Sequence, residues 1–201
     1  MLLAEGGNNS LLQGVTINEN LFKESDKWFV MELLKWSERH FQFGYTPAYI
    51  PFFIERLRAT APRLDEMTVL VSEDLMEIRE GGKWSVKEHI GHLSDIEILH
   101  DSRLEDLQSG HELRPGDPDN KATWAAHYNQ YPINEMIYHF RQLRDNFIKR
   151  VEHFPVAVLE KKSLHPRLGQ ELSLADFLYF VAEHDNHHLT FIAALLRPYL
   201  P

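Results

Sequence analysis

Apolar residues recur at helical spacing in four segments of this chain, and this periodicity is the strongest constraint on its fold. The segments span residues 49–78, 86–109, 133–153 and 174–196. In the third segment the apolar stripe consists of Ile133, Ile137, Phe140, Leu143, Phe147 and Val151. A helix with one apolar stripe must bury that stripe against other elements. The sequence therefore predicts an all-α fold, a four-helix bundle.

Capping residues mark where two of these helices begin. Ser85 is followed three residues later by Glu88, a capping box in which the two side chains satisfy backbone amides of the first turn. Ser173 and Asp176 have the same spacing before the last segment. Gly110 is expected to end the second helix, because glycine readily takes the left-handed conformation found after helix ends.

Two connections are longer than the loops that usually join neighbouring helices of a bundle, residues 111–131 and 154–172. They could cross over the end of the bundle or line a site there. Pro51 and Pro62 predict that the first helix is bent or divided, since proline lacks the amide proton that a helix interior needs. No segment shows the alternation that is typical of a β-strand.

The first part of the chain is predicted to be an extension of residues 1–44, followed by a bundle domain of residues 45–201. Residues 1–20 are polar and contain glycine, which indicates a loose lead-in. Residues 24–40 carry tryptophan and other apolar residues among charges, which predicts a short helix within the extension.

Composition excludes several classes of function. The net charge is −9, with 30 acidic and 21 basic residues and no basic block, which argues against a nucleic-acid partner. No apolar run approaches the roughly 20 residues that span a bilayer, and the N-terminus lacks the basic start of a signal peptide. We therefore expect no membrane association and a cytoplasmic location. The absence of cysteine excludes disulfides, thiolate metal ligands and a cysteine nucleophile.

Three histidines lie within five residues of the last predicted helix, His184, His187 and His188. At about 100° per residue, His184 and His188 fall within the apolar stripe and His187 lies toward its flank. Imidazoles four residues apart lie on one helix face and can bind one divalent transition metal. The alternative is a pair of core histidines whose nitrogens are satisfied by hydrogen bonds.

A catalytic metal site needs a third ligand, which should come from a facing helix. The second helix offers His89 and His92 near its start and His100 further on. Helical rotation places His89 and His100 nearer the centre of the apolar stripe and His92 toward its edge. Periodicity therefore leaves the third ligand open.

Two motifs resemble those of the DinB-like family. Residues 84–95, WSVKEHIGHLSD, are similar to the W-S-x-x-E-x-x-x-H-L-x-D signature that opens the family's second helix. Residues 184–188, HDNHH, are similar to the family's H-x-x-H-H segment on the last helix. The resemblance covers about residues 45–197 and implies a DinB/YfiT-like four-helix bundle, often dimeric. Carried onto this sequence, the family's three-histidine metal site falls on His92, His184 and His188.

The resemblance also implies a chemistry. The expected cofactor is a divalent metal ion, zinc or nickel first and manganese or iron as alternatives, with one open coordination position. Three neutral imidazoles leave the ion its full charge, so it strongly lowers the pKa of bound water or a bound thiol. Characterised relatives include transferases that use thiols such as bacillithiol or mycothiol. The implied function is a low-molecular-weight-thiol S-transferase with a small-molecule substrate and the thiol as cosubstrate.

Two other functions stay open at this stage. One is a metal-dependent hydrolase. The other is a non-catalytic metal-binding module that serves in a stress response or an interaction. Many members of the family follow the last histidine with Arg-Gly-Gln, whereas Leu189, Thr190 and Phe191 stand here. This departure removes polar groups from the mouth of the site, so no particular member's substrate is carried over.

Four further residues are candidates to support the metal or the pocket. Asp95 lies one turn beyond His92 and could orient a ligand histidine, with an exposed carboxylate as the alternative. His89 and His187 are neighbours of the proposed ligands. Arg103 shares a side of its helix with His92 and could meet an anionic substrate, with a surface salt bridge as the alternative. A homodimer is expected mainly from the resemblance.

Overall fold

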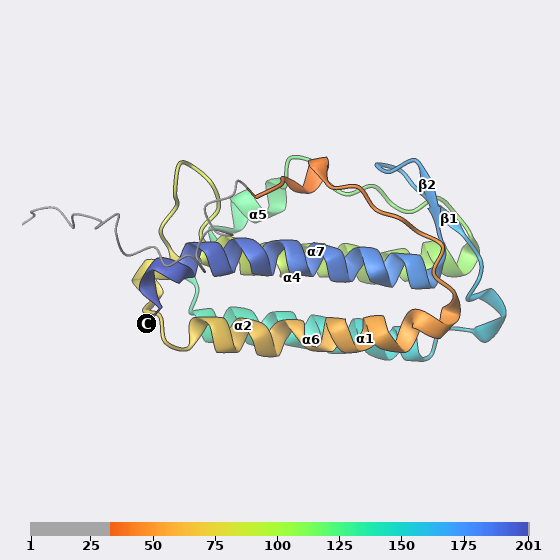
Figure 1. The fold of residues 1–201 in the computed structure, drawn as a ribbon, viewed down its shortest axis with the longest axis horizontal. Coiled ribbons are helices and arrows are strands. Elements are labelled where there is room, and N and C mark those ends of the chain that lie inside the picture. The colour runs from red at the N-terminus through yellow and green to blue at the C-terminus, as the bar shows by residue number, and fades with distance from the viewer. Residues whose placement is uncertain (1–32, 201) are drawn as a thin grey trace, which may run out of the picture. The chain divides into compact units, whose positions relative to one another are not determined.

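A computed structural model of the chain describes residues 33–200 (Figure 1). Residues 1–32 and residue 201 lie outside the described residues, and with them most of the extension and of the helix predicted in residues 24–40. The described end of that segment contains a 3-10 helix, η3, at Trp36–Glu38.

The described chain is mostly helical, and the predicted four-helix bundle is confirmed. Its helices are α1 (Ile50–Arg58), α2 (Thr60–Thr68), α3 (Glu73–Met76), α4 (Val86–Ser109), α5 (Lys121–Ala126), α6 (Ile133–Glu152) and α7 (Leu174–Leu196). The first long helix of the bundle is divided at Ala59 into α1 and α2. Pro62 explains the division, because it has no amide proton to donate to the carbonyl of Arg58.

Both predicted capping boxes are present. The backbone N–H of Glu88 donates to Ser85 Oγ at 3.2 Å, and the Ser85 N–H donates to the Glu88 carboxylate at 2.9 Å. Ser173 and Asp176 exchange the same two bonds at 3.3 and 3.2 Å. Gly110 ends α4 with a φ of 73°, in the left-handed region that glycine occupies without strain. Local sequence therefore determines both ends of α4 and the start of α7.

The bundle consists of two helical layers, with α4 and α7 in one and α1, α2 and α6 in the other (Figure 1). Helix α7 packs against α1, α2 and α4, and α6 packs against α4, α1 and α2. Consecutive long helices, α2 and α4, and likewise α6 and α7, therefore lie on the diagonals of the bundle. The connection of residues 154–172 crosses the bundle, whereas residues 111–131 join neighbouring helices and run beside α4.

The two long connections contain structure that periodicity did not predict. The first includes α5 and a 3-10 helix, η5, at Tyr128–Gln130. The second forms an antiparallel hairpin of β1 (Ser163–His165) and β2 (Gln170–Leu172), in register with Ser163 opposite Leu172. Strands of three residues are too short to show alternation. Figure 1 shows α5, η3 and the hairpin along the same side of α4 and α7.

A buried ion network joins the helices at the middle of the bundle. Arg144 of α6 donates through Nε and Nη2 to the two carboxylate oxygens of Glu97 on α4, at 2.7 and 2.9 Å. It also donates through Nη1 and Nη2 to Asp185 on α7, at 2.5 and 3.1 Å. The carbonyl of Leu57 on α1 accepts from Nη1 at 3.2 Å, and Thr60 Oγ1 of α2 donates to Asp185 at 2.7 Å. Although burial opposes it, the Arg144 guanidinium lowers the pKa of Glu97 to about 2.

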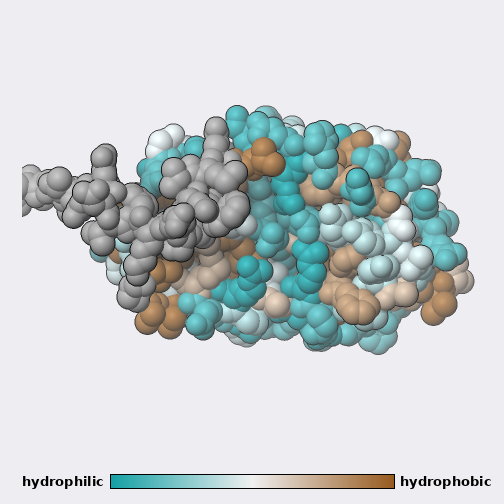
Figure 2. All heavy atoms as spheres, in the orientation of Figure 1, coloured by the Kyte–Doolittle hydropathy of each residue, from teal (hydrophilic) through white to brown (hydrophobic). Residues whose placement is uncertain are grey.

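The surface of the described residues carries several exposed apolar side chains. On the face drawn in Figure 2, hydrophobic side chains lie in separate patches with a band of hydrophilic side chains between them. Large apolar side chains that are exposed include Phe52, Val69 and Leu70 near α1 and α2. Within residues 33–200, no helix is both long and apolar enough to cross a membrane.

The substitution Arg144→Met is expected to lower the free energy of unfolding by about 3–5 kcal/mol, since it leaves two carboxylates buried without their cation. Arg141→Met on the same helix is the matched control. It removes only an exposed pair with Asp65 and should cost less than about 1 kcal/mol. Urea unfolding of the two variants measures both values. Equal losses would show that the buried network does not stabilise the bundle.

Candidate metal centre

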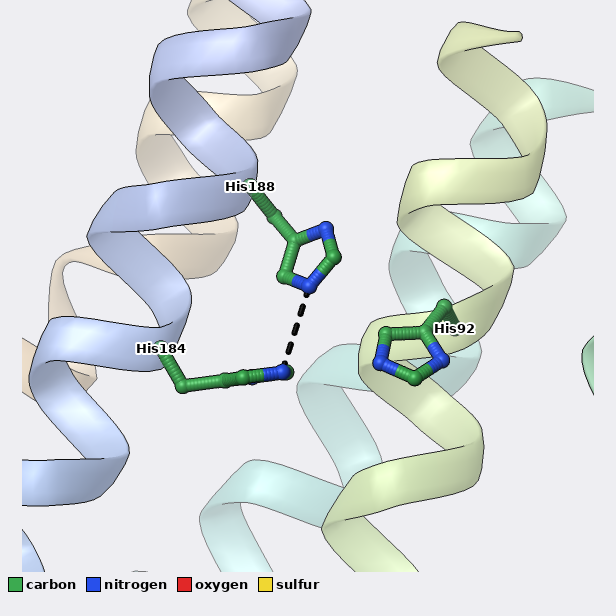
Figure 3. Close-up of side chains that lie close together, drawn as sticks. All are labelled: His92, His184 and His188. Carbon is green, nitrogen blue, oxygen red and sulfur yellow. Dashed lines mark hydrogen bonds between the residues drawn. The ribbon is translucent and has the colours of Figure 1, made fainter. Parts of the chain in front are cut away.

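Three buried histidines meet between α4 and α7. His92 comes from α4, and His184 and His188 come from successive turns of α7 (Figure 3). One ring nitrogen of each lies within 4.8 Å of the other two, a spacing at which all three could bind one ion. The Nε2 atoms of His184 and His188 are 3.2 Å apart. The structure thus brings together the three histidines that the resemblance singled out.

The contacts of His188 suit the tautomer that a metal ligand needs. Its Nδ1 lies 2.9 Å from Nδ1 of His89, which is one turn before His92 on α4. When His188 donates through Nδ1, its Nε2 carries a lone pair that points toward His184 and His92. A neutral acceptor behind a ligand imidazole holds the ring in orientation, which is how supporting groups act in metal sites.

A network of three hydrogen-bonded side chains, Tyr128, Asp95 and Thr123, holds the ring of His92 in orientation. Tyr128 and Thr123 donate their hydroxyl protons to the two carboxylate oxygens of Asp95, at 2.6 and 2.8 Å. Nδ1 of His92 lies 3.1 Å from Thr123 Oγ1. Because the threonine proton is committed to Asp95, Oγ1 accepts from His92 Nδ1–H. This leaves Nε2 of His92 unprotonated, and Asp95 acts on His92 through Thr123 instead of directly.

Gly91 leaves the space that this hydrogen-bonded network needs. A Cβ atom at Gly91 would lie 2.2 Å from the ring of Tyr128, so only glycine lets that ring lie against α4 with its hydroxyl on Asp95. The sequence predicted only that residues 111–131 could line a site, and it did not single out Thr123. No periodic signal could have found Thr123, because it lies in a long connection whose path over α4 is set by tertiary packing.

Burial keeps the three imidazoles neutral. It lowers the pKa of His92 to about 3, with smaller contributions from the neighbouring His89, His100 and His187. Burial, followed by the adjacent histidines, lowers the pKa values of His184 and His188 well below the usual range. Their lone pairs are therefore available at neutral pH. Three neutral imidazoles are a donor set that suits a divalent transition metal, so the residues present fit such an ion.

Aromatic side chains surround the histidines. The centroid of the Trp84 ring lies 4.7 Å from that of His92 and 6.0 Å from that of His188. The ring of Trp124 on α5 packs on Trp84 with its centroid 6.0 Å away. On the other side the Trp36 ring lies 5.0 Å from His184. Trp36 belongs to a stretch, residues 34–44, that the sequence analysis assigned to the extension. In the structure this stretch packs on α7, so it contributes a wall of the centre.

The remaining candidates have distinct positions. His89 is buried against His188, and His187 is half-buried at the flank, 5.5 Å from Trp36. Arg103 is buried and donates to the carbonyl of Arg114 at 2.9 and 2.7 Å. The alternative of a surface salt bridge for Arg103 is therefore wrong, because the guanidinium is covered by the segment that follows α4. Asp185, between the ligand candidates, is bound to Arg144.

The fold and the histidine cluster define a helical-bundle protein with a candidate transition-metal site. The family model of the DinB superfamily matches residues 54–192, and the chain belongs to this superfamily. The expected family is thereby confirmed.

Two solved structures share the fold. One is YfiT from Bacillus subtilis, described as "a probable metal-dependent hydrolase with an unusual four-helix bundle topology". It has a TM-score of 0.68 and 15% identity, over 80% of this chain and 93% of YfiT. The other is the mycothiol-dependent maleylpyruvate isomerase, with a TM-score of 0.56 and 12% identity, over 70% of this chain and 59% of the isomerase. At these identities the likeness shows the fold alone. No curated protein matches the chain significantly.

The free energy of unfolding of the chelator-treated protein should decrease as the pH is lowered from 7 to 5. The pKa of His92 is about 3 in the folded chain. In the unfolded chain the pKa of a histidine is about 6.5, so the unfolded state gains a proton as the pH falls below that value. From pH 7 to 5 this costs about 2 kcal/mol for His92. Urea unfolding should therefore show that His92→Gln loses about 2 kcal/mol less than the unsubstituted chain over this range.

His139→Gln is the control for this measurement, because the His139 imidazole is exposed in the folded chain. This variant and the unsubstituted chain should lose the same free energy of unfolding between pH 7 and pH 5. An identical pH dependence for all three proteins would contradict the burial of His92.

Removal of the Thr123 hydroxyl should weaken metal binding. Thr123→Val leaves His92 Nδ1 without its acceptor and is expected to lower zinc affinity about 10–100-fold. Competition with a chromogenic chelator measures the dissociation constant. Thr190→Val is a matched control, because the Thr190 hydroxyl bonds only the carbonyl of Asn186 on its own helix. If both variants bind zinc equally well, Thr123 does not orient His92.

Proposed function

We propose that this chain is a divalent-metal-dependent enzyme that acts on a small molecule through His92, His184 and His188. The observation that carries the proposal is the group of three buried, neutral imidazoles with one nitrogen each within 4.8 Å of the others. A bound divalent ion would supply Lewis-acid charge that lowers the pKa of a thiol or of water. Zinc or nickel is the expected ion, with manganese or iron as alternatives, since nitrogen ligands favour late transition metals.

A low-molecular-weight-thiol S-transferase is the favoured reaction. A free thiol has a pKa of about 8.5, whereas that of water is about 15.7, so a thiol requires much less acidification to become a nucleophile. The chain has no cysteine, so the thiol must arrive as a cosubstrate. The fold shared with a mycothiol-dependent isomerase supports this choice.

The protein's own groups would prepare the site. His89 and Thr123 would hold the rings of His188 and His92 through their Nδ1 atoms, so that the Nε2 atoms face the ion. Trp84 packs on His92 and Trp36 packs on His184, and together they limit the access of water to the histidine cluster. Exclusion of water strengthens the electrostatic interactions within a site.

Two alternatives rest on particular observations. A metal-dependent hydrolase is supported by the description of YfiT. A non-catalytic metal-binding module, with a role in a stress response or an interaction, is supported by the burial of all three histidines, which is typical of structural metal sites. A cytoplasmic location and a homodimer complete the proposal. The exposed apolar side chains near α1 and α2 offer a surface for the dimer.

Metal analysis and activity assays test this function together. Purified protein offered zinc, nickel or manganese is expected to retain one ion per chain, and His188→Ala is expected to retain none. His187→Ala is the matched control, because His187 lies at the flank of the cluster, and it should keep the ion. Conjugation of bacillithiol, mycothiol or glutathione to a bimane electrophile should fall at least about 100-fold in His188→Ala.

Each alternative has its own outcome. Turnover of a nitrophenyl ester without thiol consumption would favour the hydrolase. A bound metal whose removal strongly lowers the thermal midpoint, in a protein with no turnover of either kind, would favour the non-catalytic module. Failure of the unsubstituted chain to bind any of the three ions would refute the enzyme proposal.

A further inference from the structure

A second group of polar side chains lies beside the metal centre, toward the β1–β2 hairpin. This arginine–histidine cluster consists of His100 and Arg103 of α4 and His165 and Arg167 of the hairpin. The ring of His100 lies 5.9 Å from that of His184. The guanidinium of Arg167 lies 5.4 Å from the ring of Trp36, which itself contacts His184. The cluster therefore borders the candidate metal centre on the His184 side.

His165 presents a buried donor without an acceptor. The backbone N–H of Leu168 lies 3.4 Å from Nδ1 of His165, so this nitrogen accepts, and the proton of the neutral ring is on Nε2. His165 is only 2% exposed, and among the described residues its Nε2 has no hydrogen-bond partner. Buried N–H groups nearly always have a partner, so an unpaired one points to an absent acceptor.

Neither arginine forms an ion pair within residues 33–200, although the charge of Asp106 acts on Arg103. Arg103 is 4% exposed, and the hydrogen bonds that it makes go to the neutral carbonyl of Arg114. Arg167 contacts the ring faces of Trp36 and Phe180, and no described residue forms an ion pair with it. Burial, followed by the charges of Arg103 and Arg167, lowers the pKa of His165 to about 3, so both cations act on this imidazole.

The nearest carboxylates are already occupied. Asp106 accepts from the side chain of Arg114 at 3.1 Å, and Glu97 accepts from Arg144 at 2.7 Å. The cluster thus combines two positive charges with an N–H donor that has no partner among the described residues. Guanidinium groups beside a donor of this kind are the arrangement that binds a carboxylate or a phosphate through charge-assisted hydrogen bonds.

We propose that the arginine–histidine cluster binds an anionic group, a carboxylate or a phosphate, of the substrate or cosubstrate whose reacting atom lies at the metal centre. Nε2 of His165 donates to the anion, and Arg103 and Arg167 neutralise its charge. Arg167 is exposed and lies at the outer end of the cluster, so the anion enters on the hairpin side. The assignment of the anion to the substrate rests on the proposed function, whereas the anion site itself does not.

Anion binding by metal-free protein tests the site separately from the metal. Full-length chain, treated with chelator and then freed of it, is titrated with malonate and in a parallel experiment with inorganic phosphate. Calorimetry at constant ionic strength measures the dissociation constants. We expect saturable binding of at least one anion at one site per chain. The anion with the lower dissociation constant identifies the bound group as a carboxylate or a phosphate.

Substitutions locate the bound anion. Arg167→Met changes an exposed side chain, so it should fold normally, and it should weaken anion binding about tenfold or more. His165→Phe removes the donor while keeping a ring in place, and it should also weaken binding. Arg141→Met, which removes an exposed arginine on α6, should bind the anions as the unsubstituted chain does.

Two results would overturn the proposal. One is the absence of saturable binding of both anions to the unsubstituted chain. The other is equal affinity in Arg167→Met and Arg141→Met, which would place the anion elsewhere. Because no metal and no turnover enter the assay, failure of the metal-centre proposal leaves this result intact, and the reverse also holds.

Discussion

The ion network of Arg144 is the interaction on which the arrangement of this bundle depends. One guanidinium on α6 bonds Glu97 of α4 and Asp185 of α7, and it also reaches the carbonyl of Leu57 on α1. A buried cation needs its anions at hydrogen-bond distance, so the network restricts how α4 and α7 can slide or rotate against each other. Asp185 is the residue after His184. The same contact that closes the bundle therefore places the histidines of α7 opposite His92.

The candidate metal centre is supported from outside by two neutral groups, His89 and Thr123, that contact the Nδ1 atoms of its histidines. His89 lies behind His188, and Thr123 lies behind His92 with Asp95 and Tyr128 behind it. When each of these groups accepts the Nδ1 proton of its ring, the other nitrogen is left for a metal ion. Together with burial, which keeps the imidazoles uncharged, this arrangement prepares a ligand set without a bound ion. The long connection after α4 is thus part of the site, since it supplies both hydroxyl groups.

Charge is distributed unevenly around this centre. On one side the acidic residues Glu97 and Asp185 are neutralised by Arg144. On the hairpin side, neither Arg103 nor Arg167 forms an ion pair among the described residues, although the charge of Asp106 acts on Arg103. The site therefore offers a metal position at one end and positive charge at the other.

The sequence by itself determined the local elements and part of the site. Capping boxes at Ser85 and Ser173 predicted the first residues of α4 and α7, because a cap and its helix are neighbours in sequence. Periodicity placed His184 and His188 on one face, since a single helix fixes the relation of residues four apart. The third histidine came from a family pattern, because rotation of α4 about its axis depends on the helices around it.

Only the tertiary structure decided the remainder. The partnership of Thr123 with His92, the contact of Trp36 with His184 and the approach of the hairpin to Arg103 all join residues that are distant in the chain. The hairpin strands and α5 are too short for a periodic signal. Burial of Arg103 and Asp185 likewise depends on which segments cover them. Distances between elements follow from packing, and no spacing within one element encodes them.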